Sequence, residues 1–455
     1  MSVTRVLVAN RGEIAVRVIK ACQSLGIETV VAVSDADRES MAAQMANRAV
    51  CIGPARATDS YLKVENLIAA AQGTGCDALH PGYGFLSERA ALAQACVDNK
   101  IIFVGPSAQN ITMMGDKLEA RKIARGAGVP LVPGSDHARN PHEAAQLARD
   151  IGYPLLLKAS AGGGGRGIKL VWNAGEIEET FRVAAAEARA AFGNDTLYME
   201  RYVGNARHIE VQILGDQFGN VIHLGERDCS LQRRHQKIIE EAPAYAVPQD
   251  VRTKICNAAA TLARSIGYRS AGTIEFIYDN ETAEFYFLEM NTRIQVEHPV
   301  TEMITGVDLV GQQLLIARGE ALPFKQPEIK FSGHAIECRI NAESPQHGFR
   351  PCPGRITEWR GPVGAGIRLD THCYPGYFVP PYYDSLLAKL IVHADTRKDA
   401  ADQTMRALEN FHVSGIDTLI PFLKTVIAAP EYRSGAVNTR WLEKQLEAYS
   451  AAQNT

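Results

Sequence analysis

Several features of other protein classes are missing from this sequence. Its 455 residues contain no apolar run near the roughly 18 residues that span a membrane, and the first residues lack a signal-peptide cleavage pattern. The nine cysteines form no CxxC pair, which argues against a zinc knuckle or a disulfide framework and favours reduced thiols. The formal net charge of −3 gives no support to a nucleic-acid partner. We therefore expect a cytoplasmic protein that binds neither membranes nor nucleic acids.

Two common nucleotide-binding fingerprints do not occur where they would be expected. The turn after the first predicted strand reads ANRGEIA instead of GxGxxG, and no GxxxxGK[ST] motif occurs. The first third nevertheless alternates apolar strands with helical stretches, which predicts a doubly wound parallel sheet of the α/β class. Its predicted strands are Arg5–Ala9, Thr29–Val33, Ala78–Leu79 and Ile101–Val104, with a helix at Gly12–Leu25.

The middle third follows an α+β pattern with antiparallel strands. Tyr153–Lys158 predicts a strand that enters the glycine-rich loop Ala161–Gly167 and continues into a strand at Ile168–Val171, as in a hairpin. Further strands are predicted at Leu197–Tyr202, His208–Leu214, Val221–Leu224, Gly272–Tyr278 and Glu284–Met290. From about Phe331 the chain mixes strands, such as His334–Ile340, with a helix at Arg397–Asn410. We expect a mixed sheet and helix arrangement there.

The glycine-rich loop is a candidate phosphate cradle. Gly162–Gly165 permits positive φ and a close approach of the backbone to a ligand, and Lys158 precedes the loop. The alternative interpretation is a mobile turn that binds nothing.

Acids occur in two strands that should be apolar. Glu275 stands in TIEFIY and Glu289 in FYFLEMN, and Asn291 shares the face of Glu289 in an extended chain. Because unpaired buried carboxylates are costly, a cation should lie between them. Oxygen ligands of this kind suit Mg²⁺ or Mn²⁺. Buried salt bridges to Lys or Arg are the alternative, and the nearby glycine loop favours the metal.

The polar alternation continues past Asn291. If the chain stays extended, Arg293, Gln295 and Glu297 share the face of Glu289. The cation suits an anionic co-substrate, and Glu297 is a candidate general base. A solvated edge strand with alternating charge is the competing interpretation.

Cations gather in two other segments. Asp228–Lys237 contains Arg233, Arg234, His235 and Lys237, which is either a solvated surface or charge neutralisation around phosphate. Arg339 interrupts the apolar strand HAIECRI, where a structural ion pair is the alternative to a functional cation.

Taken together, these segments resemble the biotin carboxylase family of the ATP-grasp superfamily, and the resemblance runs through the chain to about residue 445. A different ATP-grasp ligase would share the metal and loop residues but not RIQVEHP or Arg339, and a regulatory subunit would not need all of these side chains. The segments that carry the resemblance are NRGEIA at Asn10–Ala15, HPGYGFLSE at His80–Glu88, GDK at Gly115–Lys117, KASAGGGGRG at Lys158–Gly167, ERDCSLQRRHQK at Glu226–Lys237, EMNTRIQVEHPVT at Glu289–Thr301 and ECRINAE at Glu337–Glu343.

The resemblance implies three parts and a short tail. These are a doubly wound domain at 1–113, an ATP-grasp domain at 114–330 with a mobile lid at about 131–203, a C-terminal domain at 331–446 and a tail at 447–455. It also implies two steps: ATP and bicarbonate give carboxyphosphate and ADP, and carboxyphosphate, or CO₂ released from it, then carboxylates N1 of biotin.

The resemblance assigns roles to individual residues. The catalytic set is Lys237, Arg293, Glu297 and Arg339, with Glu297 as the base and Arg339 also contacting biotin. The bicarbonate pocket is Lys237, Arg293, the Val296 backbone and Arg339, and the metal ligands at two expected Mg²⁺ or Mn²⁺ sites are Glu275, Glu289 and Asn291. The ATP set comprises Lys117, Lys158, Gly164, Gly165, Glu200, Arg201, Tyr202, Val203, His208, Gln232, His235, Glu275 and Glu289.

The resemblance also implies partners. No Met is directly followed by Lys, so we expect biotin to be attached to a separate carrier protein, with carboxyltransferase subunits completing the enzyme. A homodimer is expected, although Lys20, Ser24 and Ala365 replace the family's usual dimer residues. Ala161 replaces a lid glycine, which should have a small effect. Acetyl-CoA is the favoured acceptor, and pyruvate, propionyl-CoA or another acceptor are alternatives.

Overall fold

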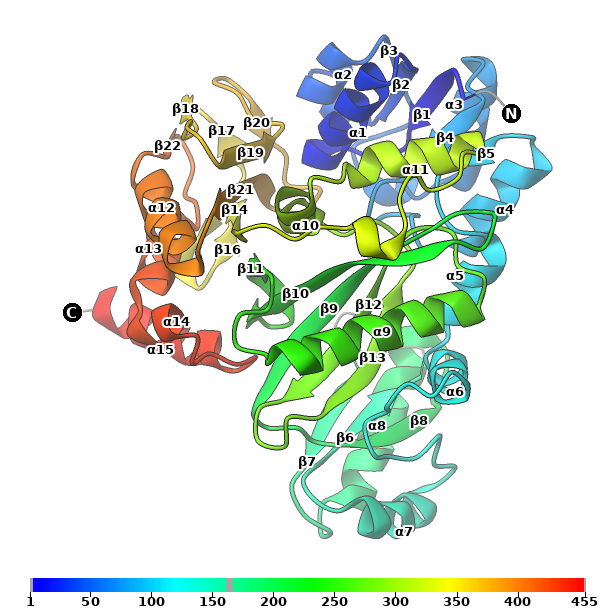
Figure 1. Ribbon diagram of the computed structural model, residues 1–455, viewed down its shortest axis with the longest axis vertical. Coiled ribbons are helices and arrows are strands. Elements are labelled where there is room, and N and C mark those ends of the chain that lie inside the picture. Colours follow the sequence, from blue (N-terminus) through cyan, green and yellow to red (C-terminus); the bar gives the residue numbers. More distant parts are fainter. Residues whose placement is uncertain (1–2, 161–166, 454–455) are drawn as a thin grey trace.

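The N-terminal part of the chain is built on a five-stranded parallel sheet (Figure 1). In the computed structural model, which describes residues 3–160 and 167–453, the strand order is β3-β2-β1-β4-β5. Apolar clusters cover both faces, and α11 from later in the chain packs beside α1 on one of them, as expected for a doubly wound sheet. The elements are β1 (Arg5–Val8), α1 (Gly12–Ser24), β2 (Glu28–Val33), α2 (Met41–Met45), β3 (Arg48–Cys51), α3 (Val64–Gly73), β4 (Ala78–His80), α4 (Ala90–Asp98) and β5 (Ile102–Phe103).

The strand β3 was not expected from the sequence. Its segment RAVC lies at the sheet edge with side chains that are mostly exposed, so it lacks the apolar run that marks a buried strand. The other predicted strands and the first helix of this part are confirmed to within about two residues.

An eight-stranded antiparallel sheet forms the centre of the molecule. Its order is β13-β12-β9-β10-β11-β14-β21-β19, so the pairing of β11 with β14 joins the middle and last thirds of the chain in one sheet. The predicted division at 330/331 therefore falls between strands of a shared sheet. The strands are β9 (Ala206–Gly215), β10 (Val221–Arg233), β11 (Gln236–Ala242), β12 (Ser270–Asp279), β13 (Phe285–Asn291), β14 (His334–Asn341), β19 (Ile367–Thr371) and β21 (Leu386–Ala394).

The strand β10 is much longer than the predicted Val221–Leu224. Its register against β9 shifts between His223 and Glu226, around Gly225 at φ 81°. After this bulge the strand continues with buried but polar residues, which hide it from an apolar pattern.

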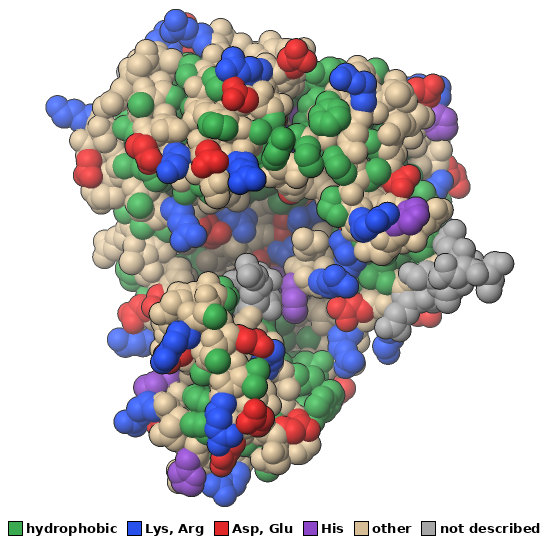
Figure 2. Space-filling model, turned by 180° about the vertical axis from the view of Figure 1, so that it is seen from behind, with side chains coloured by type: hydrophobic (Ala, Val, Ile, Leu, Met, Phe, Trp, Pro, Cys, Tyr) green, Lys and Arg blue, Asp and Glu red, His purple; other side chains and the backbone are tan. Residues whose placement is uncertain are grey.

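A small lobe contains the strands that precede and follow the glycine-rich segment in the sequence. The sheet β7-β6-β8 packs its apolar face against two helices, and β6 and β7 are antiparallel, which confirms the predicted hairpin. A hollow lined with charged side chains separates this lobe from the main body (Figure 2). The lobe contains α7 (Pro141–Ile151), β6 (Leu155–Ala159), β7 (Ile168–Val171), α8 (Ile177–Phe192) and β8 (Leu197–Arg201).

Helices cover both faces of the large sheet. α9 packs on β9 and β10, α10 packs on β11, β14 and β21, and α12 covers the opposite face of β14 and β21. None of the described helices is long and apolar enough to cross a membrane. These and the connecting helices are α5 (Ala108–Gly115), α6 (Lys117–Gly126), α9 (Gln249–Ser265), α10 (His298–Thr305), α11 (Leu309–Arg318), α12 (Arg397–Glu409), α13 (Ile420–Ala428), α14 (Pro430–Ser434) and α15 (Trp441–Gln453).

The remaining elements are short. The predicted strand at His334–Ile340 and helix at Arg397–Asn410 are confirmed to within one residue. Three two-stranded sheets and four 3₁₀ turns complete the described chain: β15 (Glu343–Ser344) with β16 (Arg350–Pro351), β17 (Gly354–Arg355) with β20 (Phe378–Val379), β18 (Glu358–Arg360) with β22 (His412–Ser414), and turns at Asp35–Asp37, Ala57–Asp59, Gln326–Glu328 and Pro345–His347.

Candidate active site

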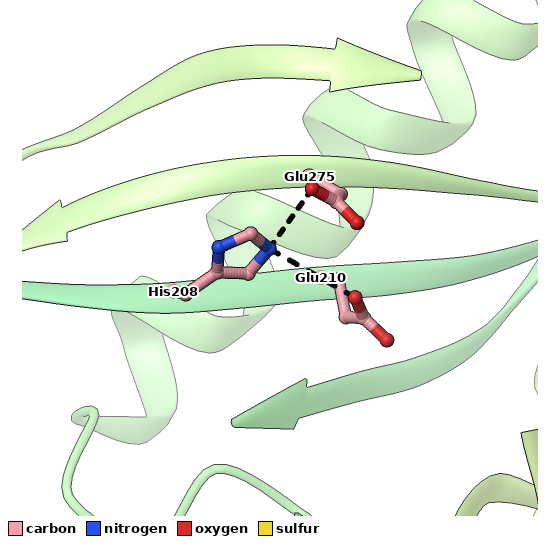
Figure 3. A group of neighbouring side chains, drawn as sticks. All are labelled: His208, Glu210 and Glu275. Atoms are coloured by element: carbon pink, nitrogen blue, oxygen red, sulfur yellow. Dashed lines mark ion pairs between the residues drawn. The ribbon is translucent and has the colours of Figure 1, made fainter. Parts of the chain in front are cut away.

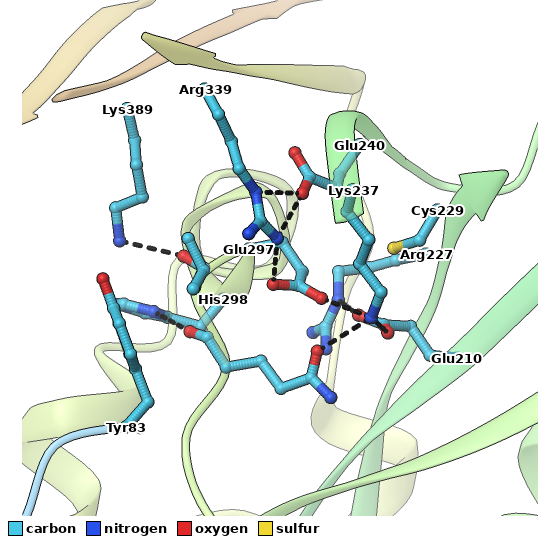
Figure 4. A network of polar contacts seen from close by, with 12 residues as sticks. Tyr83, Glu210, Arg227, Cys229, Lys237, Glu240, Glu297, His298, Arg339 and Lys389 are labelled. Carbon is cyan, nitrogen blue, oxygen red and sulfur yellow. Dashed lines mark hydrogen bonds and ion pairs between the residues drawn. The ribbon is translucent and has the colours of Figure 1, made fainter. Parts of the chain in front are cut away.

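A buried cluster of charged residues lies on one face of the eight-stranded sheet, and Lys237 is at its centre (Figure 4). The Lys237 ammonium donates to Glu275 Oε1 at 3.0 Å, Gln295 Oε1 at 3.1 Å and Glu297 Oε1 at 2.6 Å, and it also contacts Glu210. Burial alone would lower the pKa of Lys237, but the three carboxylates hold it well above its ordinary value. Lys237 therefore stays charged and fixes the side chains around it.

Glu297 is held by two cations at the end of a turn. Besides Lys237, Arg339 donates from Nη2 to Glu297 Oε2 at 2.9 Å. Burial would raise the pKa of Glu297, but Lys237, Arg339 and Arg227 hold it well below its ordinary value. The carboxylate is therefore ionised at neutral pH, as a base must be before it accepts a proton.

The structure corrects the extended conformation that we predict for the segment before Glu297. β13 ends at Asn291, the chain turns at Val296, and Glu297 is the residue that precedes α10. Pro299 lies in the first turn of this helix, a position that proline favours, so the strand cannot continue. Folding of this segment still brings Gln295 and Glu297 to Lys237, but through a turn.

Arg227 binds the cluster through Glu210, and no role is predicted for it from the sequence alone. The side chain is completely buried and donates to Glu210 Oε1 at 2.6 Å, Gln212 Oε1 at 2.8 Å and the Thr301 hydroxyl at 2.9 Å. Glu210 thus lies between Arg227 and Lys237, and its carboxylate charge is compensated on both sides. An acid inside the apolar strand HIEVQIL is the same signal that marked Glu275.

The predicted metal ligands lie together. Glu275 and Glu289 are directly opposed on β12 and β13, and Asn291 donates to Glu275 Oε1 at 2.9 Å. Burial and the charge of Glu275 raise the pKa of Glu289, and no described residue donates a hydrogen bond to its carboxylate. Two opposed acids with one amide oxygen form a hard donor set, which fits Mg²⁺ or Mn²⁺.

A second group of possible ligands fits a metal less well. His208 and Glu210 on β9 face Glu275 on β12, with His208 Nε2 at 3.0 Å from Glu275 Oε2 (Figure 3). The Lys237 ammonium contacts the carboxylates of Glu210 and Glu275 and already offsets part of their negative charge. Burial would lower the pKa of His208, but Glu275 raises it above its ordinary value, which favours the protonated ring over the neutral ligand.

The N-terminal part reaches the cluster through Glu88. Arg293 donates from Nε to Glu88 Oε2 at 2.8 Å and from Nη2 to Asn291 Oδ1 at 2.9 Å. The Thr292 amide donates to Glu88 Oε1 at 3.1 Å. Arg293 therefore links the metal ligands to the doubly wound domain.

Lys389 makes a similar link from the C-terminal part. This completely buried ammonium donates to the Val296 carbonyl at 2.9 Å and lies 3.1 Å from Glu13 Oε1, while the Tyr83 hydroxyl donates to Glu13. It fixes the peptide that precedes Glu297. A lysine inside the apolar strand LLAKLIV was the available signal, and sequence reasoning missed it.

A second cluster lies at the edge of the small lobe. Glu200 on β8 accepts from both Lys158 on β6 and Arg121 on α6, and all three side chains are buried. Burial lowers the pKa of Lys117 at the start of α6, while the charge of Glu289 raises it. The charge of Glu200 also raises the pKa of Lys117 and that of Lys158 lowers it, so groups of both clusters act on this ammonium.

Comparison with known proteins decides the family. Three family profiles match in order: "Biotin carboxylase, N-terminal domain" at residues 2–111, "Carbamoyl-phosphate synthase L chain, ATP binding domain" at 116–325 and "Biotin carboxylase C-terminal domain" at 337–444. "Biotin carboxylase 1" of Bacillus subtilis is 50% identical over 442 residues, which are 97% of this chain and 98% of that protein. The chain belongs to the biotin carboxylase family. It is an enzyme with an ATP-grasp fold.

Solved biotin carboxylase structures have the same fold. A Campylobacter jejuni biotin carboxylase in complex with a β,γ-ATP compound superposes with a TM-score of 0.94 at 45% identity, covering 97% of this chain and 99% of that one. The biotin carboxylase domain dimer of the Hydrogenobacter thermophilus 2-oxoglutarate carboxylase, with MgADP, ADP and bicarbonate, has a TM-score of 0.94 at 48% identity and covers 98% of each chain.

Some residues predicted for this biotin carboxylase lie outside both clusters. Arg201 donates to the Tyr286 hydroxyl at 2.8 Å, and Gln232 donates to the Cys229 carbonyl at 2.8 Å. His235 is exposed in the two-residue turn between β10 and β11, at φ 66°. Two further predicted residues are half-buried after β8, namely Tyr202, whose ring meets Trp172 edge-on, and Val203. Gly164 and Gly165 lie outside the described residues.

Proposed function

We propose that this enzyme carboxylates biotin held by a separate carrier protein, using bicarbonate and ATP, as the biotin carboxylase subunit of an acyl-CoA carboxylase. The observation that carries the proposal is the position of Glu297, an ionised carboxylate between Lys237 and Arg339. A base held by two cations suits a reaction that removes a proton from an anion.

The first step begins with the bicarbonate proton. Lys237, Arg293, Arg339 and the Val296 backbone hold the anion, and Glu297 takes the proton from its hydroxyl group. When Lys237 and Arg339 turn part of their charge toward bicarbonate, they stabilise the Glu297 carboxylate less, so its basicity rises. The freed oxygen attacks the γ-phosphorus of ATP, ADP leaves, and carboxyphosphate forms.

The second cluster and the neighbouring strands bind ATP. Lys117 and Lys158 contact the phosphates, and Glu200 with the segment at Arg201, Tyr202 and Val203 holds adenine. His208, Gln232 and His235 contact the ribose or the phosphates, and the loop with Gly164 and Gly165 covers them. Glu275, Glu289 and Asn291 would hold Mg²⁺ or Mn²⁺, which offsets negative charge on the phosphates.

Arg339 acts in the second step. Its guanidinium stabilises negative charge on the biotin ureido oxygen while N1 of biotin attacks the carboxyl carbon of carboxyphosphate or of CO₂ released from it. The nitrogen–carbon bond forms as the bond between the carboxyl carbon and phosphate breaks, or after it has broken to release CO₂, and the N1 proton passes to the phosphate.

The wider assembly is part of the same proposal. We divide the chain into domains at 1–113, 114–330 and 331–446, with the lid at about 131–203, and expect a cytoplasmic homodimer. The dimer described for the Hydrogenobacter domain supports this expectation. Acetyl-CoA is the proposed acceptor, with fatty acid biosynthesis as its use. The 2-oxoglutarate carboxylase shows that other acceptors serve relatives of similar identity.

The decisive assay measures ADP release with Mg²⁺, with and without bicarbonate and free biotin. Bicarbonate-dependent release that biotin stimulates supports the proposal, whereas equal turnover without bicarbonate contradicts it. Copurification of carrier and transferase subunits from the native host, followed by labelled-bicarbonate transfer to acetyl-CoA, propionyl-CoA, pyruvate or 2-oxoglutarate, identifies the acceptor.

A further inference from the structure

Two carboxylates lie buried behind Arg339. Glu240 on β11 and Glu337 on β14 are directly opposed across the antiparallel pair, and both are completely buried. Glu240 Oε1 accepts from Arg339 Nε at 2.6 Å. The other Glu240 oxygen and both oxygens of Glu337 accept no hydrogen bond from any residue that the structure describes.

The surroundings of this pair are apolar on the side away from Arg339. There the helix α10 packs on the strands, and Val300 and Ile304 of the helix form an aliphatic cluster with Ala242 of β11, Ala335 of β14 and Ile391 of β21. A carboxylate that is removed from water in such a place strongly favours its neutral form.

Few charges face the pair, and most of them are already paired. Arg339 on β14 contacts both Glu240 and Glu297, so one guanidinium serves two acids. Lys389 on β21 binds the Val296 carbonyl and Glu13, and Lys237 on β11 binds Glu210, Glu275 and Glu297. Among the described residues, the Cys229 thiol on β10 and the Cys338 thiol on β14 are further titratable neighbours, and His298 lies on the covering helix α10.

Two opposed acids that share one cation cannot both ionise at little cost. Burial raises the pKa of Glu337 well above its ordinary value, although Lys389 opposes the shift. Burial also raises the pKa of Glu240 to about 7, although Arg339 lowers it. One proton between the two carboxylates removes most of their repulsion.

We propose that Glu240 and Glu337 share a single proton at neutral pH, and that this proton leaves Arg339 positive enough to bind bicarbonate and the biotin ureido oxygen. The inference rests on the proposed function. With the proton, the pair carries one negative charge beside Arg339. Without it, the pair carries two, which exceeds the single positive charge of the guanidinium. Glu337 is a positioning residue, because it acts on the substrates only through Glu240 and Arg339.

The test is the pH dependence of bicarbonate binding in Glu337→Gln. Above the pKa of the pair, the KM for bicarbonate of the unaltered enzyme should rise by up to about tenfold per pH unit. The amide that replaces the carboxyl group in this variant cannot ionise, so at alkaline pH Glu240 alone supplies the same single charge. The rise should fall below about twofold per pH unit in the variant. Carbonate formation in alkaline solution affects both enzymes equally.

The matched control is Glu241→Gln, at the next position of β11. Glu241 faces the other side of the sheet, where it pairs with Arg397 and His334. This variant should keep the alkaline rise in KM. An unchanged rise in Glu337→Gln, or a rise lost equally in the control, overturns the proposal.

An infrared titration of the unaltered enzyme covers the case in which Glu337→Gln fails to fold. A protonated carboxyl band should be present at neutral pH and should disappear over the pH range in which bicarbonate affinity falls. Absence of the band at neutral pH overturns the inference. Failure of bicarbonate-dependent ATP hydrolysis at every pH would instead refute the proposed function, and the band would still report the shared proton.

Discussion

The two large sheets of this enzyme use burial in opposite ways. The five-stranded parallel sheet buries aliphatic side chains on both faces, such as Leu7 and Val8 on neighbouring positions of β1. The eight-stranded sheet buries acids and cations at its centre, where Glu210, Glu240 and Lys389 have no exposed surface. Burial in the first sheet contributes stability through the hydrophobic effect, whereas burial in the second shifts proton affinities and fixes charges.

Because of this difference, substitutions in the two sheets should have different consequences. An apolar core loses stability in proportion to the volume removed, and its loss does not alter the chemistry of the folded molecules. A paired charge cluster responds to the loss of one partner through the charge left behind. Substitutions that separate activity from stability therefore test the comparison directly.

The largest expected effect is on the proposed general base. Glu297→Gln should lower bicarbonate-dependent ATP turnover by about 10²- to 10⁴-fold, because the amide cannot accept the bicarbonate proton. ATP affinity, measured by equilibrium binding, should stay within about threefold, since the proposed ATP contacts lie elsewhere. Glu302→Gln, in the helix α10 that follows Glu297 and paired with Arg17 and Arg368, is the control and should keep its activity per folded molecule. An equal loss of ATP affinity in Glu297→Gln would show that its role is misassigned.

The next largest effect concerns the stability that the buried charge pair of Arg227 and Glu210 contributes. Arg227→Met should lower the free energy of unfolding by about 3–5 kcal/mol, because Glu210 keeps a buried charge with one partner fewer. Denaturant unfolding measures the change. Adding Glu210→Gln should restore part of the stability, and a double variant no more stable than Arg227→Met would contradict this explanation.

The apolar sheet should show the reverse behaviour. Leu7→Ala removes a completely buried side chain from β1 and should cost about 2–5 kcal/mol of unfolding free energy. The kcat and the KM for bicarbonate of the folded fraction should remain unchanged. A selective rise in the bicarbonate KM would break the comparison, since it would couple this core to the charge cluster.

The smallest effect concerns acid stability. Burial would raise the pKa of Glu241, but His334 and Arg397 lower it from 4.5 to about 2 in the folded protein. The stabilisation is therefore complete above about pH 4.5 and is lost as pH falls toward about 2, with an upper size on the order of 3 kcal/mol. Glu241→Gln should flatten this part of the stability curve in unfolding measurements across that range. If the stability curve of Glu241→Gln is unchanged at low pH, the loss of stability in acid is caused by other carboxylates.

Much of the candidate active site could be predicted from polar residues inside apolar strands. Glu275 and Glu289 are conspicuous in TIEFIY and FYFLEMN, and the structure places them opposite each other. The same signal was available for Glu210 and Lys389, but it does not indicate which cation meets which acid. Those partners depend on strand pairing across long sequence separations, such as β11 with β14.

Local geometry limited the remaining predictions. The strands of the parallel sheet are recognisable because burial on both faces gives continuous apolar runs, but their order is not contained in those runs. The segment after Asn291 has the alternation of a strand, yet Pro299 begins a helix and a turn delivers Glu297. Arg227 is hidden because the bulge at Gly225 interrupts the pattern of β10.

The position of Lys389 has a consequence for engineering. Its ammonium comes from the last third of the chain, contacts Glu13 in the first third and holds the Val296 carbonyl in the middle third. No excised fragment of the three can therefore carry a complete reaction centre. Chimaeras that exchange one third between homologues must preserve this three-way junction, so the natural unit of recombination is the whole chain.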